Sequence, residues 1–286
     1  IGMYSIHFND YFKIYVAESI EKGSKYIHSK HGAGCHVPEH ADTLFNHFYK
    51  ISDKIISQLN INNKLRKEIF LPVQIFKKIK KKKSNKLLIC YHGLFKYVFR
   101  PGKYNTTLEY NLKQFEQLSY SLNRLLPKIK KGLKFRNKEN HNVNYEKKFA
   151  NNFGLGQIEK VNSKPFRNSI SESKVIICFL AQTTFTEILY NNIPVILIGN
   201  KSIFFSSPKS SEIYEKFKNS GIFFDHAKKA INFLNKNWEN IDEWWFSKKT
   251  QTARDFFLRY YYKEFDKVDF NRWNNLIKNE TKILNI

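Results

Sequence analysis

Two adjacent threonines, Thr183 and Thr184, stand where a predicted strand gives way to a short helix. The apolar run 175–181 precedes them, and a second apolar run, 195–198, follows the helix. Short β-branched runs of this kind are typical of strands that are covered on both faces of a parallel sheet. The start of a helix presents main-chain N–H groups and the positive end of the helix dipole, which suit a phosphate group. The pattern therefore predicts an α/β domain that binds an anionic ligand, such as a nucleotide diphosphate, at the end of a strand.

The same turn also has a purely structural interpretation. Thr184 and Glu187 have the spacing of a capping box, in which Thr184 is the N-cap. A strand–helix–strand unit can carry such a cap without any ligand. The pattern alone leaves phosphate binding and simple capping both open.

A second candidate for chemistry is His31, which lies in a loop of small residues, 31–34, after a short strand-like segment. Glycines let a backbone approach a ligand closely, and a histidine with a pKa near neutrality can act as a general base. A loop histidine without a role fits the pattern equally well. His36, Glu39 and His40 lack the spacing of a zinc motif, which argues against a metal site.

Basic and aromatic residues follow two other predicted strands. Tyr97 and Arg100 come after the strand 86–92, and Arg136 ends the strand 132–136. The carboxyl ends of parallel strands share one edge of a sheet, so these side chains are expected near the predicted phosphate position.

The elements that must position these residues alternate between strand and helix from residue 86 onward, which indicates a doubly wound α/β domain. The predicted strands are 86–92, 132–136, 174–180, 195–198 and 222–224. The predicted helices are 110–126, a short piece near 144–150, 211–219, 226–234 and 250–265. Earlier in the chain, we expect a helix over 10–21, a strand over 26–29 and a helical or partly helical stretch over 40–56. Trp238, Trp244 and Trp245 are expected to pack a core rather than to stack on bases.

The stretch 60–86 marks the predicted domain boundary, which divides the chain into 1–70 and 71–286. It contains the lysine-rich run 77–83, interpreted as a solvated linker; the alternative is peripheral contact with anionic lipid at the inner membrane face. Because the chain opens on Ile1 within a structured pattern, we expect the first domain to be incomplete.

The composition is that of a folded protein, with 42% hydrophobic and 16% aromatic residues. Its formal net charge of +24 raises nucleic acid, an anionic membrane or an anionic small substrate as partners. The lysines are spread along the whole chain and no nucleic-acid-binding motif is visible, so a nucleic-acid partner is not expected. Cys35, Cys90 and Cys178 form neither a disulfide framework nor a zinc motif, which favours a reducing cytoplasm. No apolar run approaches the roughly 20 residues that span a bilayer.

Two motif regions resemble the bacterial transferases of the LIC type, which are similar to GT-B glycosyltransferases of surface polysaccharide synthesis. The first region comprises Ala17, Glu18, Glu21, Gly23, His31, Gly32, Gly34, Glu39, His40 and Asp53, and the second comprises Gln182, Thr183, Thr184, Glu187, Asn192 and Pro194. The chain departs from the family at Lys30, where a glutamine usually precedes the histidine. A more distant resemblance is to the polyol-phosphate transferases that prime teichoic acids.

The resemblance implies two Rossmann-like domains that face each other across a cleft, with a nucleotide-sugar donor in the C-terminal one. The implied donor contacts are Gln182, Thr183 and Thr184 at the diphosphate, Glu187 at the ribose and Arg136 at the leaving group. His31 would deprotonate the acceptor hydroxyl, and the implied acceptor-side residues are Gly32, Gly34, Glu39, His92, Tyr97 and Arg100. The helix 250–265 would cross back onto the first domain.

The resemblance also implies that no metal or cofactor is needed, because a helix dipole and basic side chains stabilise the leaving group. The acceptor is then a glycan or glycolipid. The alternatives are a CDP-linked polyol-phosphate transferase, a basic nucleic-acid-binding protein, and a degenerate transferase that serves only as a scaffold.

Overall fold

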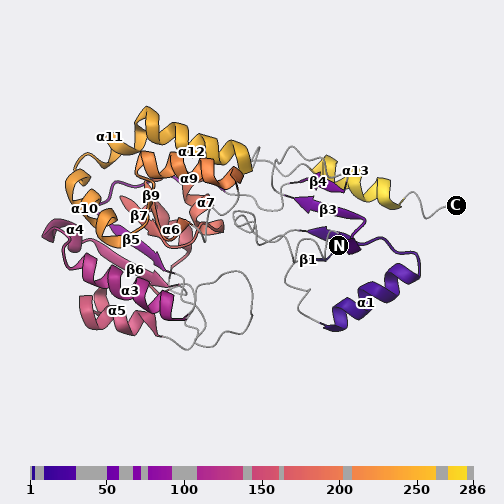
Figure 1. Cartoon of the computed structure of the whole chain (residues 1–286), viewed down its shortest axis with the longest axis horizontal. Helices are drawn as coiled ribbons and strands as arrows, with labels where there is room; N and C mark the ends of the chain where they lie inside the picture. Colours follow the sequence, from indigo (N-terminus) through magenta and orange to yellow (C-terminus); the bar gives the residue numbers. More distant parts are fainter. Residues whose placement is uncertain are drawn as a thin grey trace. The chain divides into compact units, whose positions relative to one another are not determined.

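The computed structural model of the chain describes residues 2–3, 10–29, 50–57, 67–71, 77–91, 108–137, 144–160, 164–201, 208–261 and 270–281. The chain divides into two compact units, each with its own parallel sheet (Figure 1). Unit 1 comprises residues 1–77 and 257–286, and unit 2 comprises residues 78–256.

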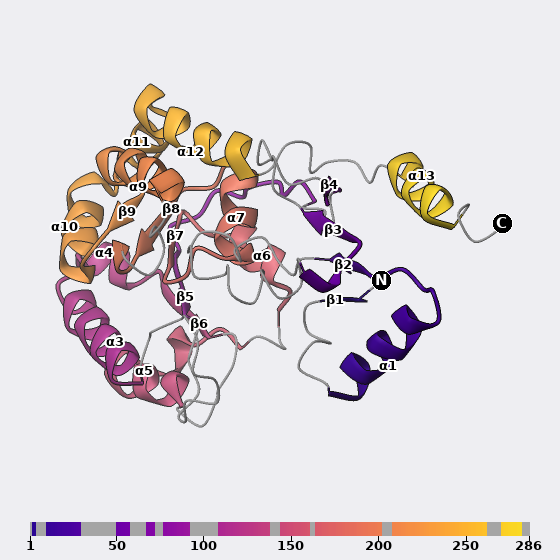
Figure 2. The ribbon, with the colours of Figure 1, turned by 45° about the vertical axis from the view of Figure 1, so that its right-hand side comes forward.

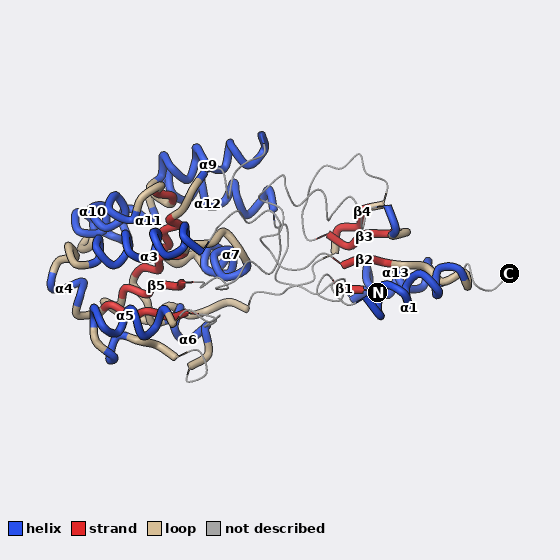
Figure 3. Tube along the Cα trace, turned by 60° about the horizontal axis from the view of Figure 1, so that its bottom comes forward, coloured by secondary structure: helices blue, strands red, loops and turns tan. Residues whose placement is uncertain are grey.

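Unit 1 is built on a four-stranded parallel sheet whose strands lie side by side in Figure 3. In spatial order these are β1 (Gly2–Met3), β2 (Ile27–Ser29), β3 (Lys54–Ser57) and β4 (Glu68–Phe70), and the helices are α1 (Asp10–Glu21) and α13 (Phe270–Thr281). Ile27 and Ile56 form a small core with Leu71 and with Leu276 of α13. The predicted helix 10–21 and the predicted strand 26–29 are confirmed.

Two features of unit 1 differ from the sequence-based expectation. The segment 257–286 belongs to unit 1, whereas the predicted division numbered it with the second domain and let its helix 250–265 cross back onto the first. The reason is that α13 contributes Leu276 and Trp273 to the small core of this unit. The predicted helical stretch 40–56 ends in strand β3, because Ile55 and Ile56 pair with neighbouring strands on both sides.

Unit 2 is built on a five-stranded parallel sheet with the order β6-β5-β7-β8-β9. The strands are β5 (Leu87–Tyr91), β6 (Leu133–Asn137), β7 (Val175–Cys178), β8 (Val195–Ile198) and β9 (Phe223–Phe224). Every residue of β7 and β8 is buried, as the continuous apolar runs predicted. Each of the five strands coincides with a strand predicted from the sequence.

Helices cover both faces of this sheet. Figure 2 shows α3, α5 and α10 on one side of β5 and β7, and α6 and α7 on the other. The helices of unit 2 are α3 (Leu108–Leu122), α4 (Pro127–Lys130), α5 (Tyr145–Phe153), α6 (Phe166–Ser171), α7 (Thr183–Tyr190), α9 (Pro208–Ser220), α10 (Ala227–Asn237) and α11 (Ile241–Phe246), together with α12 (Lys248–Tyr261), which continues into unit 1.

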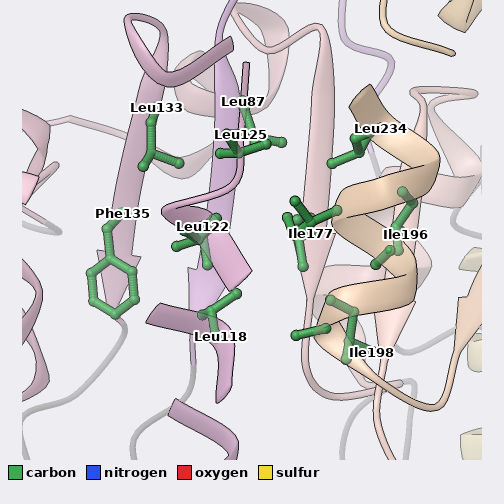
Figure 4. Close-up of a cluster of buried hydrophobic side chains, with 14 of the residues drawn as sticks. Leu87, Leu118, Leu122, Leu125, Leu133, Phe135, Ile177, Ile196, Ile198 and Leu234 are labelled. Atoms are coloured by element: carbon green, nitrogen blue, oxygen red, sulfur yellow. The ribbon is translucent and has the colours of Figure 1, made fainter. Parts of the chain in front are cut away.

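The main hydrophobic core lies between the sheet and the helices α3, α5 and α10 (Figure 4). Leu118 and Leu122 of α3 point toward the strands, and Leu234 of α10 approaches Ile177 and Ile196. Alternate residues of each strand enter this core, as a period of two requires. The apolar stripe predicted for α3 is therefore confirmed.

Two close approaches fix the outer strand β6. The Leu87 N–H donates to the Gly132 carbonyl at 3.0 Å, and a Cβ on Gly132 would lie 2.2 Å from the Asn85 carbonyl oxygen, so only glycine fits there. On the outer side, the Glu159 N–H donates to the Phe135 carbonyl at 2.8 Å, which forms an isolated bridge. The backbone around Ile158 therefore pairs with the middle of β6 on its outer side.

Candidate functional site

The strand order creates a topological switch point between β5 and β7. The chain goes from β5 to β6 on one side and returns to β7 on the other. Open α/β sheets bind ligands outside the carboxyl ends of the strands at such a point. The two strands end in step, because Cys90 pairs with Cys178 and the rings of Tyr91 and Phe179 are 5.1 Å apart. The helix that follows β7 at this end is α7.

Helix α7 begins without a side-chain cap. Its N-cap is Gln182, whose backbone is extended (φ −114°, ψ −165°) and whose side chain makes no capping hydrogen bond. The first intrahelical hydrogen bond runs from the Thr186 N–H to the Gln182 carbonyl at 3.0 Å. The predicted capping box is therefore wrong, since Thr184 is the second residue of the helix and not its N-cap. The helix dipole and the lack of a side-chain cap suit this end to an external anion.

The side chains at this helix start are not fully buried. Gln182, Thr183 and Thr184 are all partly exposed, so they are not sealed inside the protein. Phe185 is fully buried against Phe217 of α9, with the two ring centroids 5.8 Å apart. The buried Phe185 ring thus fixes the first turn, while the side chains of residues 182–184 are partly exposed to solvent.

Glu187 forms an ion pair with an arginine that the sequence analysis did not single out. The Arg167 Nε donates to Glu187 Oε1 at 3.2 Å, and the two side chains are 43% and 13% exposed. Thr183 and Glu187 are four residues apart and share one face of α7, so Arg167 stands about one helical turn from Thr183. The sequence did carry one signal for Arg167, which is the second residue of α6, the helix that precedes β7. A ribose contact for Glu187 stays a prediction.

Arg136 is bonded inside unit 2. Its Nη1 donates to Glu159 Oε1 and to the Ser169 hydroxyl, both at 3.2 Å, and its Nη2 donates to the Lys164 carbonyl at 2.9 Å. Lys86 Nζ donates to the other Glu159 oxygen at 2.5 Å. These contacts favour a structural role for Arg136, and its contact with a leaving group stays a prediction.

The electrostatics of this network centre on Glu159, a carboxylate that is 10% exposed. Burial by itself raises the pKa of Glu159. Hydrogen bonds from Lys86 and Ser169 and the charges of Lys86 and Lys164 outweigh burial and hold the pKa below its ordinary value. The carboxylate is therefore charged at neutral pH.

The end of β5 carries a cluster of aromatic rings. The Tyr91 ring lies 5.1 Å from Tyr145 and 5.5 Å from Phe115, by centroid distance. Burial, and to a smaller extent the neighbouring Tyr145 and Tyr110, raise the pKa of Tyr91, so its phenol stays neutral. The switch point therefore has an apolar, rigid neighbour on the β5 side.

Cys90 and Cys178 are neighbours on adjacent strands, and both are free thiols. Burial raises the pKa of the Cys178 thiol, and the nearby Cys90 raises it further. A buried thiol of this kind behaves as a small hydrophobe. This agrees with the interpretation of Cys178 from the sequence, whereas Cys90 is only partly buried.

The remaining predicted site residues lie outside the described part of the chain. They are His31, Gly32, Gly34, Glu39, His92, Tyr97 and Arg100. The general-base role of His31 and the acceptor-side roles of the others stay predictions.

The tryptophan group packs the core of unit 2, as predicted. Trp238 and Trp245 are almost fully buried. Trp244 is partly buried, and its indole N–H donates to the Ser220 carbonyl at 2.7 Å.

The lysine run 77–83 is fastened to unit 2 at several points. Lys81 lies 3.4 Å from Asp242, and Lys82 lies 3.5 Å from Glu172. Most of the lysine side chains are exposed, and the Lys82 N–H donates to the Ser171 carbonyl at 2.8 Å. The interpretation of this run as a solvated linker stays a prediction. Contact of this run with anionic lipid stays a prediction.

Within the described ranges, no three His, Cys, Asp or Glu side chains gather where they could hold a metal ion. Of the helices that the structure describes, none combines the length and the apolar character needed to cross a membrane.

A family model described as LIC12162 family transferase matches residues 2–277 of the chain. No curated protein sequence matches the chain.

Solved structures with a similar fold include three transferases. The glycotransferase of kitacinnamycin has a TM-score of 0.51 and 12% identity, covering 93% of this chain and 73% of that one. The wall teichoic acid polymerase TagF has a TM-score of 0.49 and 10% identity, covering 93% and 70%. The pneumococcal O-GlcNAc transferase GtfA, in complex with UDP and GlcNAc, has a TM-score of 0.48 and 12% identity, covering 90% and 52%. At these identities the likeness concerns the fold alone, and the first of them confirms the predicted GT-B-like α/β fold.

Proposed function

Because the chain belongs to the LIC12162 family of transferases, we propose that it transfers a glycosyl group from a nucleotide-activated sugar to an acceptor of surface polysaccharide synthesis. The observation that carries this proposal is the N-terminus of α7, which lacks a side-chain cap and lies at the switch point between β5 and β7. Family and fold support transfer chemistry, and the position of α7 supports a phosphate-bearing donor.

In this proposal the first turn of α7 binds the donor diphosphate. Main-chain N–H groups and the hydroxyls of Thr183 and Thr184 contact its oxygens, and the helix dipole favours their negative charge. Arg167 supplies the cation that the sequence analysis assigned to Arg136, because the Arg136 guanidinium is bonded internally. Glu187 orients Arg167 through their ion pair. Charge that develops on the leaving diphosphate is stabilised at this site.

The transfer itself needs a nucleophile from the acceptor. An acceptor hydroxyl oxygen forms a bond to the anomeric carbon, and the bond from that carbon to the diphosphate oxygen breaks. His31 takes the hydroxyl proton as general base. The proposed acceptor contacts are Gly32, Gly34, Glu39, His92, Tyr97 and Arg100.

The proposal is tested by calorimetric titration of the chain with UDP, GDP and CDP. Thr184→Ala removes one hydroxyl. Thr183→Pro removes the first N–H of the helix, and proline fits there because Gln182 is extended. A hydrogen bond to a charged group contributes about 1.5–3 kcal/mol, so each variant should bind the preferred nucleotide about 10- to 100-fold more weakly.

The matched control is Thr252→Ala, which removes an exposed threonine hydroxyl from α12. It should bind the nucleotide as the unmodified chain does. Absence of binding to all three nucleotides by the unmodified chain would refute the proposal. In a second titration with intact donors, preference for a CDP-linked polyol over nucleotide-sugars would instead support polyol-phosphate transfer.

A further inference from the structure

The first passage of the chain from unit 1 to unit 2 is anchored on the C-terminal turn of α7. The passage lies between residues 77 and 78. Directly after it, the Ile79 N–H donates to Asn191 Oδ1 at 2.7 Å. Lys78 Nζ lies 4.2 Å from the centroid of the Tyr190 ring, which is a cation–π distance. A segment more than a hundred residues away in sequence is thus fixed to the end of this helix.

The second passage, between residues 256 and 257, is anchored on the same turn. Shortly before it, Arg254 Nε donates to the Leu189 carbonyl at 2.6 Å, and Arg254 Nη2 donates to the Tyr190 carbonyl at 3.2 Å. The last carbonyls of a helix lack intrahelical partners and carry the negative end of the dipole, so a guanidinium satisfies them well. The Arg254 side chain is only 13% exposed.

The turn that receives both anchors is itself tightly fixed. Asn192 has a left-handed backbone (φ 53°), which asparagine tolerates better than most residues. Its Oδ1 accepts hydrogen bonds from the Trp245 indole at 2.8 Å and from the Gln251 amide at 3.1 Å. The Asn191 amide also donates back to the Glu187 carbonyl at 2.9 Å. A displacement of either anchor is therefore transmitted to the helix rather than absorbed by the turn.

We propose that Arg254 and Asn191 are positioning residues for the donor site, and that they couple the N-terminus of α7 to both connections between the units. This inference rests on the proposed function. Helix α7 has only eight residues, about 12 Å in length, and its Phe185, Ile188 and Leu189 side chains are buried, so it moves as one rigid body. Coupling is reciprocal: an anion that fixes one end of α7 also orders the connections at the other end.

The test measures hydrogen exchange by mass spectrometry, in the free chain and with the nucleoside diphosphate that the unmodified chain binds best. In the free chain, Arg254→Met and Asn191→Ala should each raise exchange in three segments together: 78–83, 183–192 and 255–261. Strand β5 should not change. A purely local structural role predicts a response only around the substituted residue.

With the nucleotide bound, the unmodified chain should show added protection in 78–83 and 255–261. Arg254→Met should lose that protection and bind the nucleotide about three- to tenfold more weakly. Arg254→Lys keeps the charge but loses the planar fork, so it should be intermediate, and it serves if the methionine variant does not fold. The matched control is Arg124→Met, which removes an exposed arginine from the chain segment after α3.

The outcomes separate this inference from the proposed function. If the unmodified chain binds no nucleotide, the proposed function fails, and the exchange pattern of the free variants still decides whether the connections are coupled. If exchange rises only locally in Arg254→Met, or if that variant binds nucleotide as Arg124→Met does, the inference is wrong.

Discussion

At the scale of single residues, three arginines join separate segments of unit 2: Arg136, Arg167 and Arg254. Arg136 joins β6 to Glu159 and to the chain around Ser169, and Arg254 holds the end of α7. Arg167 pairs with Glu187 near the middle of α7. A guanidinium offers five N–H donors in a fixed plane, so it can satisfy several acceptors that one ammonium group cannot.

We expect Glu159→Gln to destabilise unit 2 strongly. The substitution leaves Arg136 and Lys86 buried without their carboxylate, and breaking a buried ion pair from one side costs about 3–5 kcal/mol. Urea unfolding followed by tryptophan fluorescence at pH 7 measures the loss. A free energy of unfolding equal to that of the unmodified chain would show that this network contributes little.

The free energies of unfolding of the unmodified chain and of Glu159→Gln should differ less in acid. The pKa of Glu159 is lower in the folded chain than in the unfolded chain, so its contribution is fully present above the unfolded value and is lost as the pH falls through the folded value. The stability difference between the unmodified chain and Glu159→Gln should therefore shrink as the pH is lowered below about 4.5. A difference that grows in acid would contradict this assignment.

The sequence could predict a residue of the candidate site only where the neighbouring residues determine its position. Thr183 and Thr184 follow a buried strand after a turn of four residues, and no distant partner is needed to place them. Arg136 could not be assigned from the sequence, because its partner Glu159 lies in a polar stretch without periodicity. The capping box failed because the helix starts at Thr183, two residues before the first helical position that an N-cap at Thr184 predicts.

At the scale of elements, long or strongly apolar segments were predictable and short polar ones were not. Most strands of unit 2 carry short apolar runs, and helix α3 carries a clear apolar stripe. Helices α6, α11 and α13 and strand β4 were missed, since each is short or polar and forms because of tertiary contacts. The stretch 40–56, predicted to be helical or partly helical, ends in strand β3 because pairing with β2 and β4 decides its conformation.

Gly132→Ala tests the fit at the start of β6. The added Cβ would meet the Asn85 carbonyl oxygen at 2.2 Å, and main chain cannot move aside as a flexible side chain can. Strain of this kind costs about 1–3 kcal/mol, so the Tm should fall by several degrees in scanning calorimetry.

Gly156→Ala is the matched control for that substitution, because its Cβ would meet no atom within 4 Å. We expect it to stay within about 0.5 kcal/mol of the unmodified chain. Equal stability of the two alanine variants would mean that β6 shifts freely to make room.

At the scale of the whole molecule, the net charge of +24 opposes compactness through self-repulsion. Salt screens charges more than about 10 Å apart at 0.1 M ionic strength. We therefore expect the Tm to rise by a few degrees between 10 mM and 300 mM NaCl. A Tm that falls with added salt would show that attractive ion pairs outweigh repulsion.

The bridge between Phe135 and Ile158 has a consequence for behaviour in concentrated solution. An outer strand with unsatisfied amides invites a strand from another copy, which is how many sheet proteins polymerise. Here the middle of that outer strand is already occupied by the chain's own backbone, and the strand at the opposite margin, β9, has only two residues. Unit 2 therefore offers little template for fibre growth, even when expressed at high levels.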